Sequence, residues 1–129
     1  NPPPYMICHK PYSYQELPNV MDQFDVLVTP SEWEETFGFT VLEALSYGIP
    51  VIVSEKVGAK DLILEGKNGF VVDGTIQGVK DCLKKLINNP LIVQQMNSNI
   101  VDSFYVKTMA EHACEIEMLY RKKVIIEEE

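Results

Sequence analysis

Short apolar runs alternate with helical patterns along this chain, and this alternation restricts the fold more than any other feature. The three clearest runs cover residues 25–29, 50–54 and 70–72. They are apolar almost throughout rather than at every second position, which is typical of strands covered on both faces. Strands that alternate with helices indicate βαβ units and a parallel sheet. The sequence therefore predicts an α/β fold built on a doubly wound parallel sheet.

Helical patterns fill most of the remaining chain. The predicted helices cover residues 41–47, 59–64, 76–87, 91–101 and 107–125. A shorter helix is expected before the first of the three runs, because Ser13 and Glu16 have the spacing of a capping box and Pro18 suits a first helical turn. A short strand is also predicted for residues 5–8. We expect the chain to end in a long helix.

The composition is that of one globular domain with an acidic surface. The chain has 129 residues, and 11 basic against 19 acidic side chains give a net charge of −8. This charge argues against nucleic acid or an anionic membrane as the main partner, since both require a basic patch. Cys8, Cys82 and Cys114 are far apart and odd in number, so neither a disulfide framework nor a structural zinc site is expected. No metal site is predicted.

Other features of the chain bear on its location and origin. No apolar run reaches the ~18 residues of a membrane-spanning helix, and the amino terminus lacks the pattern of a signal peptide. The scattered cysteines favour a reducing compartment, so we expect a cytoplasmic protein. Because the chain does not begin with Met, it is expected to be a fragment or a processed form.

The segment from residue 30 to residue 53 carries the most chemical information. Glu35 and Glu43 are separated by seven residues, Gly38 lies between them, and a helix is expected to open near Thr40. In doubly wound sheets, ligands bind beyond the carboxyl ends of the strands, where this segment begins. A glycine lets a ligand approach the backbone closely.

The start of this predicted helix suits an anion. Its first amides, those of Phe39, Thr40, Val41 and Leu42, have no partner within a helix, and the helix dipole adds to their attraction. Carboxylates such as Glu35 and Glu43 accept hydrogen bonds from hydroxyl groups. The segment therefore predicts a ligand that has a phosphate flanked by polyhydroxylated groups.

The same segment resembles a known family. The resemblance rests on residues 30–31, 35–39, 41–44, 48–51, 57–58 and 66–70, and in order and spacing it covers roughly residues 5–125. On these residues the chain resembles the carboxyl-terminal donor domain of retaining glycosyltransferases with the GT-B architecture, the group 1 family (family four). The resemblance implies a Rossmann-like sheet and a nucleoside-diphosphate sugar as donor substrate, with no cofactor and no metal.

The resemblance also implies roles for single residues. Glu35 takes the place of the catalytic-site glutamate beside the donor sugar, and Glu43 that of the glutamate that binds the ribose hydroxyls. The amides of Phe39, Thr40 and Val41 take the place of those that contact the sugar and the diphosphate, and Gly38 and Leu42 are also expected to bind the donor. Gly58 matches the first glycine of a turn near the sugar, where Ala59 replaces the second.

The expected parent enzyme is larger than this chain. Residues 1–129 would form part of the donor domain, without the amino-terminal acceptor lobe and without the basic pair that grips the diphosphate. The parent would transfer a sugar with retention, in polysaccharide or glycolipid biosynthesis, in the cytoplasm or at the inner face of the membrane. The fragment is expected to be inactive and to self-associate through an exposed sheet edge.

Alternatives stay open at this point. The chain could be a nucleotide-sugar binding module without catalysis, or part of a nucleotide-sugar 2-epimerase of the same fold, although the glutamate spacing favours the transferase. Glu43 could cap its helix through a box with Thr40. Glu35 could belong to a solvated acidic run, and Trp33 could anchor the loop or line an acceptor path. The sugar, the base and the acceptor are not predicted.

Overall fold

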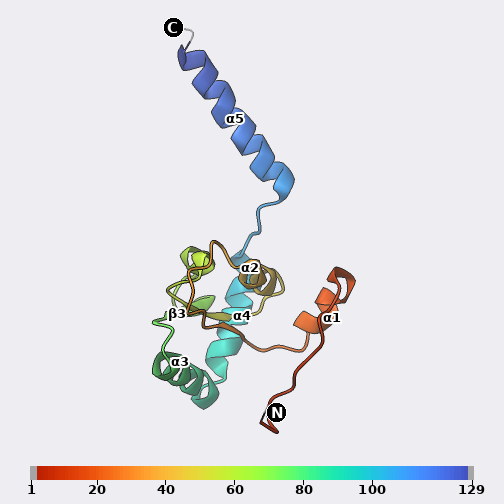
Figure 1. Ribbon diagram of the computed structural model, residues 1–129, viewed down its shortest axis with the longest axis vertical. Helices are drawn as coiled ribbons and strands as arrows, with labels where there is room; N and C mark the ends of the chain where they lie inside the picture. The colour runs from red at the N-terminus through yellow and green to blue at the C-terminus, as the bar shows by residue number, and fades with distance from the viewer. Residues whose placement is uncertain (1–2, 128–129) are drawn as a thin grey trace.

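The computed structural model is an α/β fold with a three-stranded parallel sheet (Figure 1). It describes residues 3–127, with side chains as far as residue 122. The strands are β1 (Leu27–Thr29), β2 (Val51–Ser54) and β3 (Gly69–Val72), in the order β1-β2-β3. The register aligns Val28 with Ile52 and Ile52 with Phe70. The predicted fold class and all three main strands are confirmed.

Helices pack against both faces of the sheet, and one further helix comes after it in the chain. They are η1 (Tyr14–Glu16), α1 (Leu17–Met21), α2 (Phe39–Ser46), η2 (Gly58–Leu62), α3 (Ile76–Asn88), α4 (Leu91–Ser103) and α5 (Met109–Glu127), where η denotes a 3-10 helix. The predicted capping box is present, since the amide and the hydroxyl of Ser13 donate to the Glu16 carboxylate at 2.8 and 2.7 Å. These bonds lower the pKa of Glu16.

The core consists of two apolar clusters, one on each face of the sheet. On one face, Val51 and Val53 of β2 pack with residues of α2 and η2, among them Leu45. On the other face, Ile52 and Phe70 pack with α3 and α4. Because successive strand residues point to opposite faces, a strand with both faces covered must be apolar throughout. This explains why all four residues of β2 are buried.

The β1 side of the sheet is less covered than its centre. All residues of β1 are half-buried. Next to it, four apolar residues repeat at helical spacing along α3, and we call them the α3 strip: Ile76, Val79, Leu83 and Ile87. The strip lines a cavity together with Pro30, which follows β1. Ile76 and Ile87 are 89% and 73% exposed, so this helix presents apolar surface to solvent.

One local expectation is wrong, and two helix boundaries differ slightly from the prediction. Residues 5–8 do not form a strand but an exposed turn and coil, because none of the three strands found within residues 3–127 pairs with this segment. The helix after β1 begins at Phe39, two residues before the predicted start, and the short helix after β2 is a 3-10 helix that begins at Gly58.

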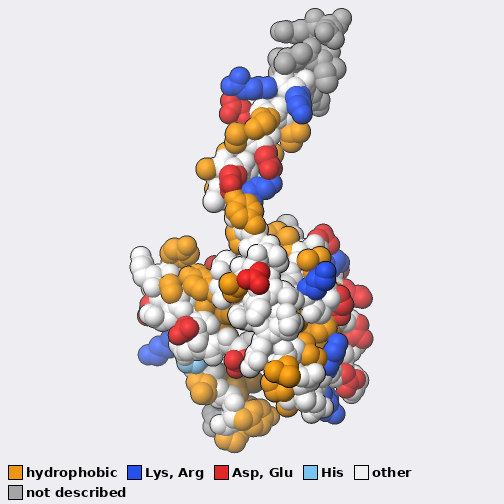
Figure 2. All heavy atoms as spheres, turned by 180° about the vertical axis from the view of Figure 1, so that it is seen from behind, with side chains coloured by type: hydrophobic (Ala, Val, Ile, Leu, Met, Phe, Trp, Pro, Cys, Tyr) orange, Lys and Arg blue, Asp and Glu red, His pale blue; other side chains and the backbone are white. Residues whose placement is uncertain are grey.

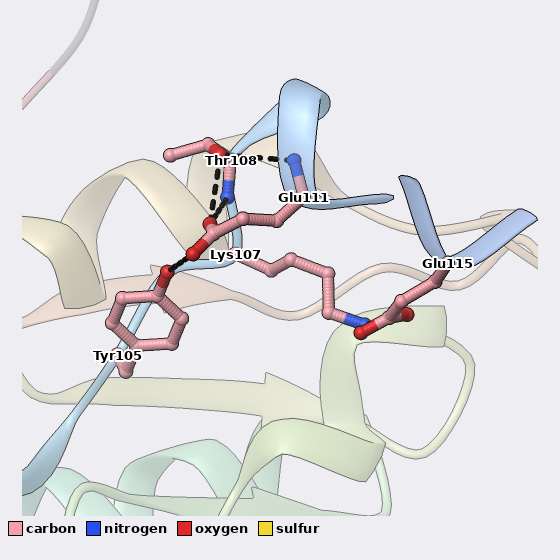
Figure 3. A network of polar contacts seen from close by, with 5 residues as sticks. All are labelled: Tyr105, Lys107, Thr108, Glu111 and Glu115. Carbon is pink, nitrogen blue, oxygen red and sulfur yellow. Dashed lines mark hydrogen bonds and ion pairs between the residues drawn. The ribbon is translucent and has the colours of Figure 1, made fainter. Parts of the chain in front are cut away.

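The long carboxyl-terminal helix is confirmed, and α5 projects away from the rest of the molecule (Figure 1). Apolar and charged side chains are mixed along it (Figure 2). The hydroxyls of Tyr105 and Thr108 both donate to the Glu111 carboxylate at the start of this helix, and Lys107 pairs with Glu115 at 2.5 Å (Figure 3). Among the described residues, none of the helices has both the length and the hydropathy of a membrane span.

Candidate functional site

The loops that leave β1 and β2 are joined by backbone hydrogen bonds. The amide of Glu35 donates to the carbonyl of Lys56 at 2.9 Å, and the amide of Gly58 donates to the carbonyl of Glu35 at 3.0 Å. A third bond runs from the amide of Ala59 to the carbonyl of Phe37 at 2.5 Å. These bonds continue the parallel pairing of β1 with β2 beyond the strands, so the two loops form one surface at the carboxyl edge of the sheet.

A buried serine strengthens the same connection. Ser54, the last residue of β2, is fully buried, and its hydroxyl donates to the carbonyl of Ser31 at 2.7 Å. Sequence analysis did not identify this contact. The sequence gives one hint of it, which is a hydroxyl at the end of an otherwise apolar strand. If such a hydroxyl is buried, it needs a hydrogen-bond partner on a neighbouring segment.

Gly38 is required by the backbone. Its φ is +91°, in the left-handed region that side chains rarely adopt. A Cβ at this position would lie 2.9 Å from Cγ1 of Val57 and 3.4 Å from Oε2 of Glu35. The Glu35 carboxylate therefore lies beside Gly38, at the amino terminus of α2. A ligand would have to approach the Gly38 backbone from another side, because Val57 and Glu35 occupy this one.

The first turn of α2 supplies fewer free amides than the sequence predicts. The amide of Val41 donates to the carbonyl of Gly38 at 3.0 Å, so the expectation of a free amide at Val41 is wrong. A 3-10-type bond has tightened the start of the helix. Phe39 and Thr40 are exposed at this helix end, and Leu42 is half-buried. The anion site is thus expected at the amides of Phe39 and Thr40.

Glu43 does not take part in a capping box. The residue before α2 is Gly38, so Thr40 lies inside the helix, and no side chain caps this helix. The alternative that Glu43 forms a box with Thr40 is therefore wrong. Glu43 is half-buried, one turn further along α2 than Phe39. Its role as a ribose ligand stays a prediction.

The backbone packing around residue 58 leaves no room for a side chain, so this residue must be glycine. A Cβ on Gly58 would lie 2.2 Å from the carbonyl oxygen of Thr36, closer than any side chain tolerates. Glycine is needed so that the two loops can approach each other. Ala59 follows with its methyl group fully buried in the core. A contact of Gly58 with a donor sugar stays a prediction.

The aromatic side chains of this region are largely exposed. Trp33 is 82% exposed, so its indole does not anchor the loop by packing against the described core. Phe39 is 72% exposed, and its ring centroid lies 5.1 Å from that of Phe37. Glu32 and Glu34 are exposed, as expected for a solvated acidic run.

Two lysines, Lys56 and Lys60, lie on the segment that follows β2. The Lys60 ammonium donates to the carbonyl of Glu55, a contact that sequence analysis missed. Lys56 is exposed. Across residues 3–122, no three His, Cys, Asp or Glu side chains gather as ligands of a metal ion would. The expectation that no metal takes part stays a prediction.

The described residues form an α/β fold whose candidate site lies at the carboxyl edge of its parallel sheet. The sequence model of the family described as "Glycosyl transferases group 1" matches residues 6–102. The chain belongs to the group 1 family of glycosyl transferases.

Relatives agree with this membership. D-inositol 3-phosphate glycosyltransferase from Corynebacterium diphtheriae is 31% identical over 107 residues, which is 82% of this chain and 25% of the relative. Alpha-1,3/1,6-mannosyltransferase ALG2 from Dictyostelium discoideum is 31% identical over 67% of this chain and 21% of its own length. The chain therefore spans about a quarter or less of the length of these two relatives.

Solved structures share the fold. Anabaena Alr3699/HepE, in a crystal structure with UDP, has a TM-score of 0.68 and 25% identity over 81% of this chain and 29% of its own. Another structure of that protein, with UDP-glucose, gives a TM-score of 0.60 at 28% identity over 66% of this chain and 24% of its own. The two structures are of the same Anabaena protein, one in complex with UDP and the other in complex with UDP-glucose.

Proposed function

We propose that this chain forms part of the donor site of a retaining glycosyltransferase of family four, which transfers a sugar from a nucleoside-diphosphate sugar to an acceptor. One observation carries the proposal. The loop after β2 holds Glu35 beside Gly38, at the amino terminus of the helix that also carries Glu43. Two carboxylates and a helix start thus lie on one short segment at the carboxyl edge.

Each group has a role in binding the donor. The amides of Phe39 and Thr40, with the positive end of the helix dipole, suit the diphosphate. Glu43 would accept hydrogen bonds from the ribose hydroxyls, and Glu35 would lie beside the donor sugar. Gly58 would place its turn near the same sugar.

The reaction explains why such groups are needed. Transfer with retention builds positive charge on the anomeric carbon and negative charge on the departing diphosphate. Preorganised amides stabilise the leaving group without having to reorient during the reaction. A carboxylate beside the sugar, Glu35, would stabilise the positive charge. The proposal needs neither a metal nor a cofactor.

The family and the relatives support a transferase rather than the 2-epimerase. The relatives are named as glycosyltransferases, and the similar Anabaena protein has been solved with UDP and with UDP-glucose. We therefore choose uridine diphosphate as the first nucleotide to test. A binding module without catalysis would bind the nucleotide in the same way, so transfer must be assayed as well.

The experiment is a calorimetric titration of the full-length parent with UDP and with UDP-glucose, beside a transfer assay that follows release of the nucleoside diphosphate. We expect saturable binding, and sugar transfer with the α or β configuration of the donor retained. ADP and GDP sugars are the matched alternatives. If none of these nucleotides binds, the proposed function is wrong; binding without transfer would leave only the binding module.

The wider expectations belong to this proposal. An acceptor lobe and a basic pair for the diphosphate are expected in the remaining length of the parent, and the 129-residue chain alone is expected to be inactive. We infer a role in polysaccharide or glycolipid biosynthesis, in the cytoplasm or at the inner face of the membrane. Sugar transfer by the purified 129-residue chain at the rate of the parent would contradict the expectation that catalysis needs the rest of the parent.

A further inference from the structure

Trp33 lies at a bend of the loop that carries Glu35, and it is the single tryptophan of the chain. Its side chain is 82% exposed. The loop is fixed on both sides of this bend. The Ser54 hydroxyl holds the carbonyl of Ser31 at 2.7 Å, and the carbonyl of Lys56 accepts a bond from the amide of Glu35 at 2.9 Å. A fixed backbone therefore presents the indole to solvent.

The exposed indole contributes little to the described fold. Large aromatic side chains contribute most to stability when they are buried, and Trp33 contributes little to the core. Its loop is already held by backbone and serine hydrogen bonds, so the indole is not needed to anchor it. Within the described residues the ring is therefore available for a contact with a ligand.

The neighbouring charges restrict the ligand. Glu32, Glu34 and Glu35 are all exposed beside Trp33 in the sequence, and the whole chain carries a net charge of −8. Carboxylates repel phosphate-rich partners such as nucleic acid and anionic lipid surfaces. They accept hydrogen bonds from hydroxyl groups, while the face of an indole packs against apolar C–H groups. A sugar ring offers both kinds of group.

We propose that Trp33, with Glu34, forms a contact site for a neutral saccharide, which is the acceptor of the transfer reaction. The inference rests on the proposed function, because it assigns the acceptor class from a residue two positions before Glu35. Glu32 lines the neighbouring cavity with Lys80 and Lys84, so the carboxylate assigned to the saccharide is that of Glu34. The donor domain would thus contribute a contact to the acceptor as well as to the donor.

The single tryptophan provides a direct test on the 129-residue chain. Fluorescence emission and acrylamide quenching are measured during titration with methyl glycosides and with short neutral oligosaccharides. A saturable blue shift with reduced quenching is expected, because a stacked sugar removes water and quencher from the indole. Glycerol and phosphatidylglycerol vesicles are the controls. A response that does not saturate with any saccharide, or that saturates only with the vesicles, would overturn the proposal.

Variants of the full-length parent give a second readout. With the saccharide that gives the largest fluorescence response as acceptor, Trp33→Ala should raise the KM for that acceptor about five- to tenfold and leave UDP affinity unchanged. Trp33→Phe should recover part of the loss, and Tyr14→Ala, which removes another ring that is 81% exposed, should change neither quantity. An unchanged acceptor KM in Trp33→Ala would refute the contact.

The two proposals can fail separately. If the parent binds UDP but Trp33 responds to no saccharide, only the acceptor contact is wrong. If the parent binds no nucleotide while Trp33 still shows a saturable response to a saccharide, the proposed donor function fails and the saccharide contact stands.

Discussion

Glu35 and Gly58 lie on loops that leave different strands, and the amide of Gly58 donates a 3.0 Å hydrogen bond to the carbonyl of Glu35. The carboxylate of Glu35 reaches the space beside Gly38. The position of the proposed catalytic-site glutamate thus depends on the loop after β2, and a change at Gly58 is expected to displace Glu35.

Gly58→Ala tests this dependence. The new Cβ would lie 2.2 Å from the carbonyl oxygen of Thr36, so the loops must separate, at a cost of roughly 1–3 kcal/mol in the free energy of unfolding. We expect both a lower melting temperature and weaker UDP binding. The comparison is Gly66→Ala, where the nearest atom is 4.0 Å away and only backbone strain at φ +71° arises. Gly66→Ala should lower stability but leave UDP binding unchanged; equal binding in both variants would contradict the coupling.

Glu43→Gln tests the ribose contact. The variant keeps the shape of the side chain but removes its charge, so UDP affinity should fall by about 1.5–3 kcal/mol, the range for a hydrogen bond to a charged group. Because no side chain caps α2, the melting temperature should stay unchanged. Calorimetric titration and a thermal melt measure the two quantities, with Asp102→Asn, a change at an exposed carboxylate of α4, as the control. A lower melting temperature with unchanged UDP affinity would mean that Glu43 is structural.

Glu35→Gln should behave differently from Glu43→Gln. Glu35 is proposed to lie beside the sugar, so turnover should fall more than UDP affinity does. Steady-state kinetics of the parent with UDP-glucose, together with UDP titration, separate the two effects. Loss of UDP affinity equal to the loss of turnover would place Glu35 at the nucleotide rather than at the sugar.

The α3 strip predicts self-association of the 129-residue chain. Ile76 and Ile87 are 89% and 73% exposed next to an edge strand, and exposed apolar surface of this kind favours association. Ile87→Lys should weaken the association, measured by sedimentation velocity across a range of concentrations. Leu64→Lys, at a residue 59% exposed on another surface, should have little effect. If the unmodified chain stays monomeric at high concentration, the α3 strip does not mediate self-association.

The start of α5 should resist acid. The hydroxyl of Tyr105, followed by the hydroxyl and amide of Thr108, lowers the pKa of Glu111 from 4.5 to about 2. A carboxyl whose pKa is lowered in the folded state stabilises above its usual pKa, and this contribution is lost as the pH falls through about 2. NMR titration of the Glu111 carboxyl should give a midpoint near 2, and amide exchange at Thr108 should increase in the same range.

The variants Tyr105→Phe and Glu111→Gln check the cause of this shift. Tyr105→Phe should raise the pKa of Glu111, because it removes the hydrogen bond that lowers this pKa the most. Glu111→Gln should expose the Thr108 amide to exchange even at neutral pH. A midpoint near 4.5 in the unmodified chain would show that the network of Figure 3 does not form in solution.

Much of the fold follows from local sequence patterns. The strands β1, β2 and β3 were predicted within two residues because each is a short apolar run, although only β2 is buried throughout. The predicted strand at residues 5–8 was wrong because an apolar run forms a strand only beside a partner, and this segment has none. The free amide expected at Val41 is paired with Gly38, since the sequence does not determine how tightly a helix begins.

The sequence alone determined the α/β alternation and the spacing of Glu35, Gly38 and Glu43, because these depend on residues that are close in the chain. Only the tertiary structure decided that the loops after β1 and β2 pair with each other, that Gly58 must be glycine, and that Trp33 is exposed. Such features depend on hydrogen bonds between segments about 20 residues apart, and the register of a parallel sheet, rather than a local pattern, fixes which of those backbone groups meet.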